Sequence, residues 1–358
     1  MAQLVQPSYV RVADLSLTQD EFGRILRRIG LTRDEVKGAP SKDLLFLLHQ
    51  RFFHAMPFEN IGVFEGEVVS LDLKSLVDKM CGPDGNSPRG GYCFELNKVF
   101  AALLLHLGFE VEPKGSRVFL DDGVTPRLPT YPLMTHMVLV VSAGAQLFLC
   151  DVAFGKVGLV NPVPLDSANT GPFNGGHFRL KLERQTFRSR HAFQYDSYFL
   201  WYTEEAHSET SKWTRGYSFV PVQDFDFMDA LPCNLQVHGY FESPFTQRLW
   251  CEKRSQEAHV RILGKHFLEK TSEGTVQRDI DTAEELQALL LHHFRLSISK
   301  SMCQHMLGVG TAAASEDKWR RLVAARAGAG SANSQSRLVL GIAFSLAALA
   351  LVGWMKRP

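Results

Sequence analysis

Apolar residues recur at helical spacing through the first third of the chain. Thr18 and Glu21 form a capping-box pattern before one such stretch, and Ser41 can cap the next. A third stretch follows Cys93 and consists of Leu96, Val99, Phe100, Leu103 and Leu104. These patterns predict a helical region over residues 1–110, with Cys93 near the N-terminus of its last helix.

From residue 111 to about 225 the apolar runs become shorter and alternate, with Gly and Pro between them. This pattern is typical of a β-barrel or a β-sandwich. Beyond it, strand-like segments around 247–269 precede a helix that Asp281 or Thr282 can cap. The chain therefore combines helical and β-rich regions, and it contains no internal repeat.

The last sixty or so residues have a different composition. Residues 308–336 are rich in Ala, Gly and Ser, and we expect a flexible linker over 301–337. Residues 338–355 carry no charge and lie between Arg337 and Lys356. An α-helix of that length is about 27 Å long, close to the about 30 Å of bilayer hydrocarbon. We therefore expect a C-terminal hydrophobic tail helix, a transmembrane tail anchor that keeps the rest of the chain on the cytosolic face.

Overall composition limits the class of partner. The chain has 358 residues, with 39 basic and 38 acidic side chains and a net charge of +1. Without a long basic run, nothing in it favours nucleic acid as a partner. The six cysteines include no CxxC pair and the N-terminus has no secretory signature, so we expect reduced thiols and no metal site.

Cys93 has the setting of an activated nucleophile. It follows Gly90 and Gly91, which can take backbone conformations closed to other residues, and it precedes the helical pattern. The N-terminal end of a helix favours negative charge and therefore a thiolate. The alternative is that Cys93 is a buried small hydrophobe.

Two further residues can complete a catalytic group with Cys93. The apolar runs 134–141 and 146–155 flank a turn that contains Gly144, which predicts an antiparallel hairpin. His136 lies in the first run and Asp151 in the second, and they face each other across the ladder if the turn centres near residue 143 or 144. An imidazole can hold a thiol as a thiolate while a carboxylate orients the ring. Alternatively, His136 is a core histidine and Asp151 bonds to backbone.

Four motifs resemble the arylamine N-acetyltransferases, particularly the bacterial-type sequences. They are Pro57-Phe58-Glu59-Asn60, the segment from Arg89 to Asn97, Thr135-His136-Met137 and the segment from Asp151 to Gly155. The similarity runs from about residue 10 to about residue 300. It implies an α+β fold with a helical bundle over 1–110, a central β-barrel over 111–225 and an α/β lid over 226–300, around a cysteine-protease-like Cys-His-Asp core.

The same resemblance implies an activity. Cys93 would take the acetyl group of acetyl-CoA as a thioester, His136 would act as base and acid, and Asp151 would orient His136. An arylamine, hydrazine or similar small amine would then attack the thioester in a ping-pong scheme. Acetyl-CoA is a co-substrate in this scheme, and no cofactor is permanently bound.

The resemblance also implies supporting roles. Arg89 and Glu59 would form an ion pair that braces the nucleophile loop. The residues beside the acyl group and CoA would be Thr135, Phe154, Gly155 and Tyr217. Two of these assignments have alternatives, since Phe154-Gly155 can be an ordinary strand end and Tyr217 can be a core aromatic. The interval from Cys93 to His136 is a few residues longer than is usual in the family, and Pro132-Leu133 replaces the small residue and glycine of vertebrate members.

Two other function classes remain open at the level of sequence. A thiol hydrolase or transglutaminase-like enzyme could use the same three residues and would turn over without CoA. A catalytically silent, membrane-tethered scaffold would not need an intact Cys-His-Asp set.

Overall fold

The computed structural model describes most of the first 308 residues. The described ranges are 14–65, 68–82, 88–119, 132–155, 158–166, 170–173, 176–186, 194–203, 213–240, 243–255 and 257–308. The chain divides into one unit of residues 1–310 and a second of residues 311–358. The expected tail anchor at 338–355 therefore lies outside the described residues. Within the ranges given above, no helix is long and apolar enough to cross a membrane.

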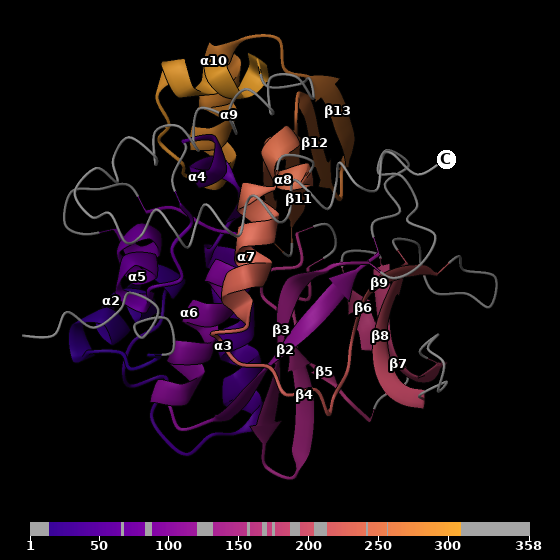
Figure 1. Cartoon of the computed structure of the whole chain (residues 1–358). Helices are drawn as coiled ribbons and strands as arrows, with labels where there is room; N and C mark the ends of the chain where they lie inside the picture. The colour runs from indigo at the N-terminus through magenta and orange to yellow at the C-terminus, as the bar shows by residue number, and fades with distance from the viewer. Residues whose placement is uncertain are drawn as a thin grey trace, which may run out of the picture. The chain divides into compact units, whose positions relative to one another are not determined.

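The helices expected in the first third of the chain are present (Figure 1). The expected ones are α2 (Gln19–Ile29), α3 (Lys42–Ala55) and α6 (Cys93–His106), and the structure adds the short α4 (Ile61–Phe64) and α5 (Leu73–Cys81), which were not predicted individually. Thr18 and Glu21 form the expected capping box of α2, and the Ser41 side chain accepts a hydrogen bond from the N–H of Leu44 at the start of α3. Helix α6 is buried from Cys93 to Leu104, which makes it the central element of the bundle.

Most of the middle of the chain folds into one antiparallel sheet of eight strands. Its order is β5-β4-β3-β2-β9-β8-β7-β6, and in Figure 1 it is strongly curved, as in a barrel that is nearly closed. The strands are β2 (Glu110–Val118), β3 (Met134–Ala143), β4 (Gln146–Cys150), β5 (Val163–Pro164), β6 (Thr170–Phe173), β7 (Gly176–Thr186), β8 (Gln194–Thr203) and β9 (Thr214–Phe219). Helix α6 packs against β3 and β2, which places the helix that begins at Cys93 beside the strand that carries His136.

A second sheet joins the two ends of the unit. Its order is β1-β10-β11-β12-β13, with β1 (Phe58–Glu59), β10 (Trp250–Arg254), β11 (Ala258–Leu263), β12 (His266–Thr271) and β13 (Gly274–Asp279). Strand β1 belongs to the region expected to be helical, yet it pairs with β10 of the lid. The Asn60 side chain adds to this connection, because its Nδ2 donates to the carbonyl O atoms of Phe245 and Arg248.

The remaining helices are α7 (Ala230–Gly239), α8 (Pro244–Gln247), α9 (Ala283–Phe294) and α10 (Lys300–Gly308). The Thr282 side chain caps α9, as expected. Helix α10 corrects the linker assignment at 301–337, because its Cys303 and Met306 are buried in the core. Those two residues are three apart and face the same side of a helix, so the ordered chain continues past residue 301.

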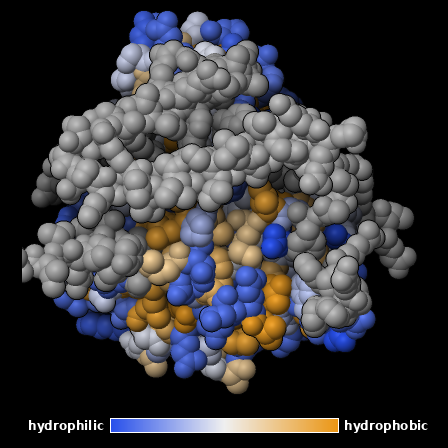
Figure 2. Space-filling view, in the orientation of Figure 1, coloured by the Kyte–Doolittle hydropathy of each residue, from blue (hydrophilic) through white to orange (hydrophobic). Residues whose placement is uncertain are grey.

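The buried apolar side chains form two clusters. The larger surrounds α6 and contains Cys93, and the smaller lies on the β-sheet and contains Phe154 and Tyr217. On the surface seen in Figure 2, hydrophobic and hydrophilic residues alternate over the lower part of the described chain, and hydrophilic residues cover the top. Some large apolar side chains are exposed, among them Leu133 and Leu182, which are 53% and 54% exposed.

Candidate active site

The loop before Cys93 is packed against the segment from Pro57 to Glu59. The N–H of Gly91 donates to Pro57 O, and Gly91 O accepts from the N–H of Glu59. A Cβ on Gly90 would lie 1.8 Å from Pro57 O, and one on Gly91 would lie 2.8 Å from Oε2 of Glu95. Both glycines are therefore required by close approach of neighbouring atoms, and the loop can take only a narrow range of positions.

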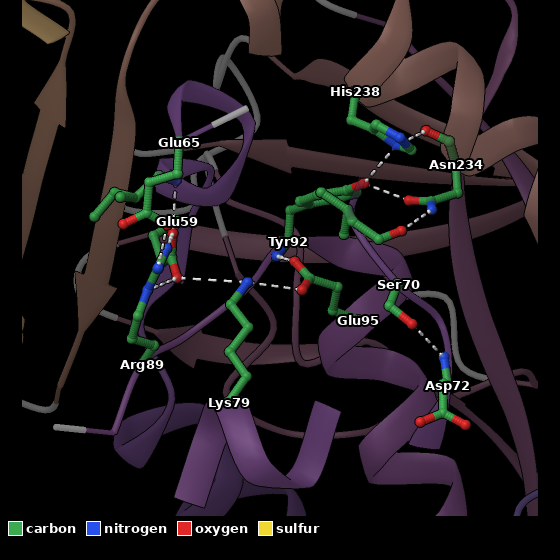
Figure 3. A network of polar contacts seen from close by, with 12 residues as sticks. Glu59, Glu65, Ser70, Asp72, Lys79, Arg89, Tyr92, Glu95, Asn234 and His238 are labelled. Atoms are coloured by element: carbon green, nitrogen blue, oxygen red, sulfur yellow. Dashed lines mark hydrogen bonds and ion pairs between the residues drawn. The ribbon is translucent and has the colours of Figure 1, made fainter. Parts of the chain in front are cut away.

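A buried ionic cluster lies under this loop (Figure 3). The Arg89 guanidinium contacts the Glu59 carboxylate at 3.2 Å, and Lys79 Nζ lies 2.7 Å from Glu95 Oε1 and 3.7 Å from Glu59 Oε1. Burial opposes ionisation of Glu59, but the charges of Lys79 and Arg89 lower the pKa of that carboxyl to about 2. The expected Arg89–Glu59 pair is thus part of a larger set of charges that includes Lys79, Glu95 and Glu65.

Tyr92 connects the nucleophile loop to helix α7. Its N–H donates to Oε2 of Glu95 at 3.0 Å, which caps the start of α6. Its hydroxyl donates to Oδ1 of Asn234, and Nδ2 of Asn234 donates to Val69 O at 2.9 Å. Nδ1 of His238 lies 2.7 Å from the backbone O of Asn234 and 3.5 Å from the Tyr92 hydroxyl (Figure 3). The residue before Cys93 is therefore held by contacts from α6, α7 and the segment before α5.

Cys93 is the first residue of α6 and is 3% exposed. Its Sγ lies 3.6 Å from Thr135 O, the carbonyl that precedes His136 on β3. This contact places the thiol beside the strand that carries the imidazole. The structure therefore brings Cys93, Thr135 and His136 together from segments about forty residues apart.

His136 and Asp151 form a buried pair, in which Nε2 lies 2.8 Å from Oδ2. Burial disfavours the charged imidazole, but the charges of Asp151 and then Cys93, with hydrogen bonds to both side chains, raise the pKa of His136 to about 10. Burial alone would raise the pKa of Asp151, whereas His136 and the hydrogen bonds from Asn97 and Ala153 lower it. The arrangement favours an imidazolium next to the thiol.

The expected register of the hairpin needs correction. The turn consists of Gly144 and Ala145, and the last pairs of the ladder are Val140 with Leu149 and Leu139 with Cys150. In that register Asp151 is not opposite His136, which pairs instead with Ser116 on β2. The two side chains still meet, because β4 ends at Cys150 and the chain then leaves the ladder toward His136.

The segment after β4 is held by side chains from two helices. The N–H of Asp151 donates to Nε2 of His49 on α3 at 3.2 Å, and the N–H of Val152 donates to Oδ1 of Asn97 on α6 at 3.1 Å. Nδ2 of Asn97 also donates to Oδ1 of Asp151 at 3.0 Å. These contacts fix both the backbone and the carboxylate of Asp151.

The residues expected beside the acyl group and CoA lie in different environments. Thr135 is half-buried, and Phe154 packs with its ring 5.7 Å from that of His136. Tyr217 is 0% exposed, with its ring 5.1 Å from His136 and 4.9 Å from Phe154. This burial favours the alternative in which Tyr217 is a core aromatic that covers the His136 ring.

Gly155 lines a small recess with a volume of about 20 Å³. The recess also contacts Phe58, Phe154, Lys253 and Arg254. A Cβ on Gly155 would lie 2.8 Å from the Phe58 ring, so a larger residue would close this wall of the recess.

Sequence reasoning missed several supporting residues. Asn97 lies four residues after Cys93, one helical turn along the same face, and that spacing could have identified it. Lys79 and Glu95 could have been suspected as partners of a charged loop. His49 had no such signal, because the N–H that it accepts belongs to a residue 102 positions away.

Comparisons with known proteins bear on the family and the fold of the chain. A family model described as N-acetyltransferase matches residues 43–303. The chain is 27% identical over 260 residues to an arylamine N-acetyltransferase from Escherichia coli, which covers 72% of this chain and 83% of that one. It is 33% identical over 150 residues to the arylamine N-acetyltransferase / N-hydroxyarylamine O-acetyltransferase of Salmonella typhimurium. That match spans 42% of this chain and half the length of that relative.

The fold is also similar to solved structures. The arylamine N-acetyltransferase of Mycobacterium marinum in complex with CoA superposes with a TM-score of 0.67 at 22% identity. The superposition covers 81% of this chain and 100% of that one. At this sequence identity the structural similarity supports only the fold, and the match to the family model supports the family of the chain.

Proposed function

The chain belongs to the arylamine N-acetyltransferase family, and we propose that it transfers an acetyl group from acetyl-CoA to an arylamine or hydrazine through a thioester on Cys93. One observation supports this route above the others. The thiol of Cys93 lies at the N-terminus of α6, beside a buried His136 whose other side is bonded to Asp151.

In the first half-reaction the Cys93 sulfur acts as the nucleophile. The His136 imidazole holds the thiol proton, and the N-terminal end of α6 stabilises the negative charge on sulfur. The thiolate attacks the thioester carbon of acetyl-CoA, a new C–S bond forms to Cys93, and the bond to the CoA sulfur breaks. The imidazolium returns its proton to the departing CoA thiolate.

In the second half-reaction the amine nitrogen attacks the acetyl carbon on Cys93. His136 accepts the proton that the nitrogen loses, and the C–S bond to Cys93 breaks as the amide forms. The product leaves and the Cys93–His136 pair is restored. Asp151 keeps the ring in the orientation that both transfers need, because its Oδ2 fixes Nε2 and leaves Nδ1 for the thiol.

The recess beside Gly155 is the proposed approach for acetyl-CoA. Phe58 and Phe154 give it an apolar wall. Its charged lining consists of Lys253, Arg254 and Glu252, which leaves one net positive charge that suits phosphate groups. Thr135 is not part of the recess lining, but its carbonyl oxygen lies beside the Cys93 thiol. In this proposal Tyr217 supports His136 from behind and does not touch CoA.

Steady-state kinetics test the proposed route. Initial rates at varied acetyl-CoA and amine should give parallel double-reciprocal lines, because the acetyl-enzyme separates the two half-reactions. Intersecting lines would indicate direct transfer in a ternary complex. Cys93→Ser should lose nearly all turnover, with Cys233→Ser as a control that leaves the nucleophile in place. Turnover of acyl donors to water without CoA would favour a thiol hydrolase instead.

We also propose that residues 338–355 anchor the chain in a membrane. The support is the run of uncharged residues between Arg337 and Lys356. Carbonate-washed membranes should retain the full chain and release a chain shortened to Gly330, with acetyltransferase activity in both. A full chain that washes off freely would contradict the anchor.

A further inference from the structure

His49 is a buried histidine whose two ring nitrogens have different partners. Nδ1 lies 3.0 Å from Val160 O, and Nε2 lies 3.2 Å from the backbone N of Asp151. A carbonyl oxygen can only accept a hydrogen bond and an amide N–H can only donate one. The ring is therefore the tautomer with hydrogen on Nδ1 and a lone pair on Nε2.

The surroundings keep this ring neutral. His49 is 0% exposed and packs edge-on against Phe100, with ring centroids 5.5 Å apart. Burial lowers the pKa of His49 to about 4 despite the opposing effects of Val160 O and Asp151. An imidazolium would also carry hydrogen on Nε2, which would then face the N–H of Asp151.

The contact between His49 Nε2 and the N–H of Asp151 lies where the chain leaves the β3–β4 hairpin. The β3–β4 ladder ends at Leu139 and Cys150, so the N–H of Asp151 is the first one beyond the strand. A buried backbone N–H needs an acceptor. His49 supplies it, Asn97 does the same for Val152, and the Asp151 carboxylate accepts from the N–H of Ala153. Successive amides are thus held at the place where the chain turns toward His136.

We propose that His49 is a positioning residue for acetyl transfer, which as a neutral acceptor fixes the backbone of Asp151 and so directs the carboxylate onto His136. The inference rests on the proposed function, because it requires the His136–Asp151 pair to serve Cys93. Without the acceptor, the amide of Asp151 would seek another partner and the departure from β4 would shift. The His136 ring would then lose its fixed orientation while the fold remained.

A pair of substitutions separates the two hydrogen bonds of His49. The oxygen of a glutamine can occupy the place of Nε2 and keep the contact with Asp151, whereas an asparagine can reproduce only the Nδ1–H contact with Val160. His49→Asn should therefore lower kcat by about tenfold or more, and His49→Gln should restore a large part of that loss. His106→Asn is a control, since His106 stacks on Phe22 at the far end of α6.

The decisive readout is the rate of iodoacetamide reaction with Cys93 as a function of pH. A change of orientation at His136 should move this profile in His49→Asn to higher pH but leave it in place in His49→Gln and His106→Asn. A purely structural role would lower the melting temperature of both His49 variants equally and move neither profile. That result would overturn the inference.

Measurements on the wild type keep the inference testable if His49→Asn does not fold. The ¹⁵N NMR shifts of the His49 ring at pH 7 should show hydrogen on Nδ1 and none on Nε2. The opposite tautomer or an imidazolium would overturn the inference. If the wild type acetylates amines, Cys93→Ser abolishes that activity and His49→Asn leaves it unchanged, only this inference is contradicted. If the wild type never forms an acetyl-enzyme, the proposed function itself is contradicted.

Discussion

Nδ2 of Asn97 lies 2.6 Å from Met137 O and 3.0 Å from Oδ1 of Asp151, so one amide group joins helix α6 to the strand of His136 and to the carboxylate that contacts it. Asn97→Ala should lower kcat/KM by about tenfold or more and cost about 1–3 kcal/mol of stability, because it leaves buried polar groups without partners. Steady-state kinetics and urea unfolding measure both effects. A variant with full activity would show that Asn97 matters for folding alone.

The close contact at Gly90 makes a second prediction. Gly90→Ala would place a methyl group 1.8 Å from Pro57 O, a backbone atom that cannot move alone. The variant should be strongly destabilised or inactive, because the loop must shift Cys93. Gly23→Ala is the matched control, since a Cβ at this helical position meets only the ends of two flexible side chains, Arg33 Nη2 at 3.4 Å and Arg27 Nη1 at 3.7 Å. It should gain about 0.5–1 kcal/mol from helix propensity. Equal effects of the two substitutions on activity would contradict this account of the loop.

The buried ion pair under the loop should be far more costly to break than a surface pair. Arg89→Met leaves Glu59 fully buried near one remaining cation, Lys79, and should cost about 3–5 kcal/mol. Arg184→Met removes the partner of Asp196 on the exposed surface and should change stability very little. Denaturant unfolding of the two variants checks the difference. Similar losses would show that the cluster does not brace the nucleophile loop.

Local patterns predicted the elements that carry the site better than their long-range contacts. The capping residues Thr18 and Ser41 and the helix after Cys93 depend on residues within a few positions, and the structure agrees with each. Strand β13 was missed because all of its residues, Gly274–Asp279, are exposed and show no apolar alternation. The pairing of β1 with β10 was missed because it joins segments about two hundred residues apart.

In the candidate site, too, local features were predicted better than long-range contacts. The three candidate catalytic residues lie together, but the hairpin register was wrong by two positions because the turn centres between Gly144 and Ala145. The contact between His136 and Asp151 depends on the chain leaving the ladder after Cys150, and His49 and Asn97 hold that departure. Such contacts come from packing of α3 and α6 on the sheet, which no local pattern encodes.

The pH dependence of stability should report the charged state of His136. Its pKa is about 10 in the folded chain against an ordinary value of 6.5, so the folded state binds more protons between these values. The contribution of His136 is complete below pH 6.5 and is lost as the pH rises through 10. Urea unfolding of the wild type should show this fall, and His136→Gln should show a smaller one. Equal falls in the two proteins would contradict the assignment of the charge to His136.

The most direct test of the central claim is mass spectrometry of the full chain after incubation with acetyl-CoA alone. A thioester route predicts one acetyl group on the peptide that contains Cys93, and its release when an arylamine is added. The adduct should be absent from Cys93→Ser and strongly reduced in Asp151→Asn, because the misplaced imidazole no longer holds the thiolate. An unmodified Cys93 in a preparation that nevertheless acetylates arylamines would contradict the account.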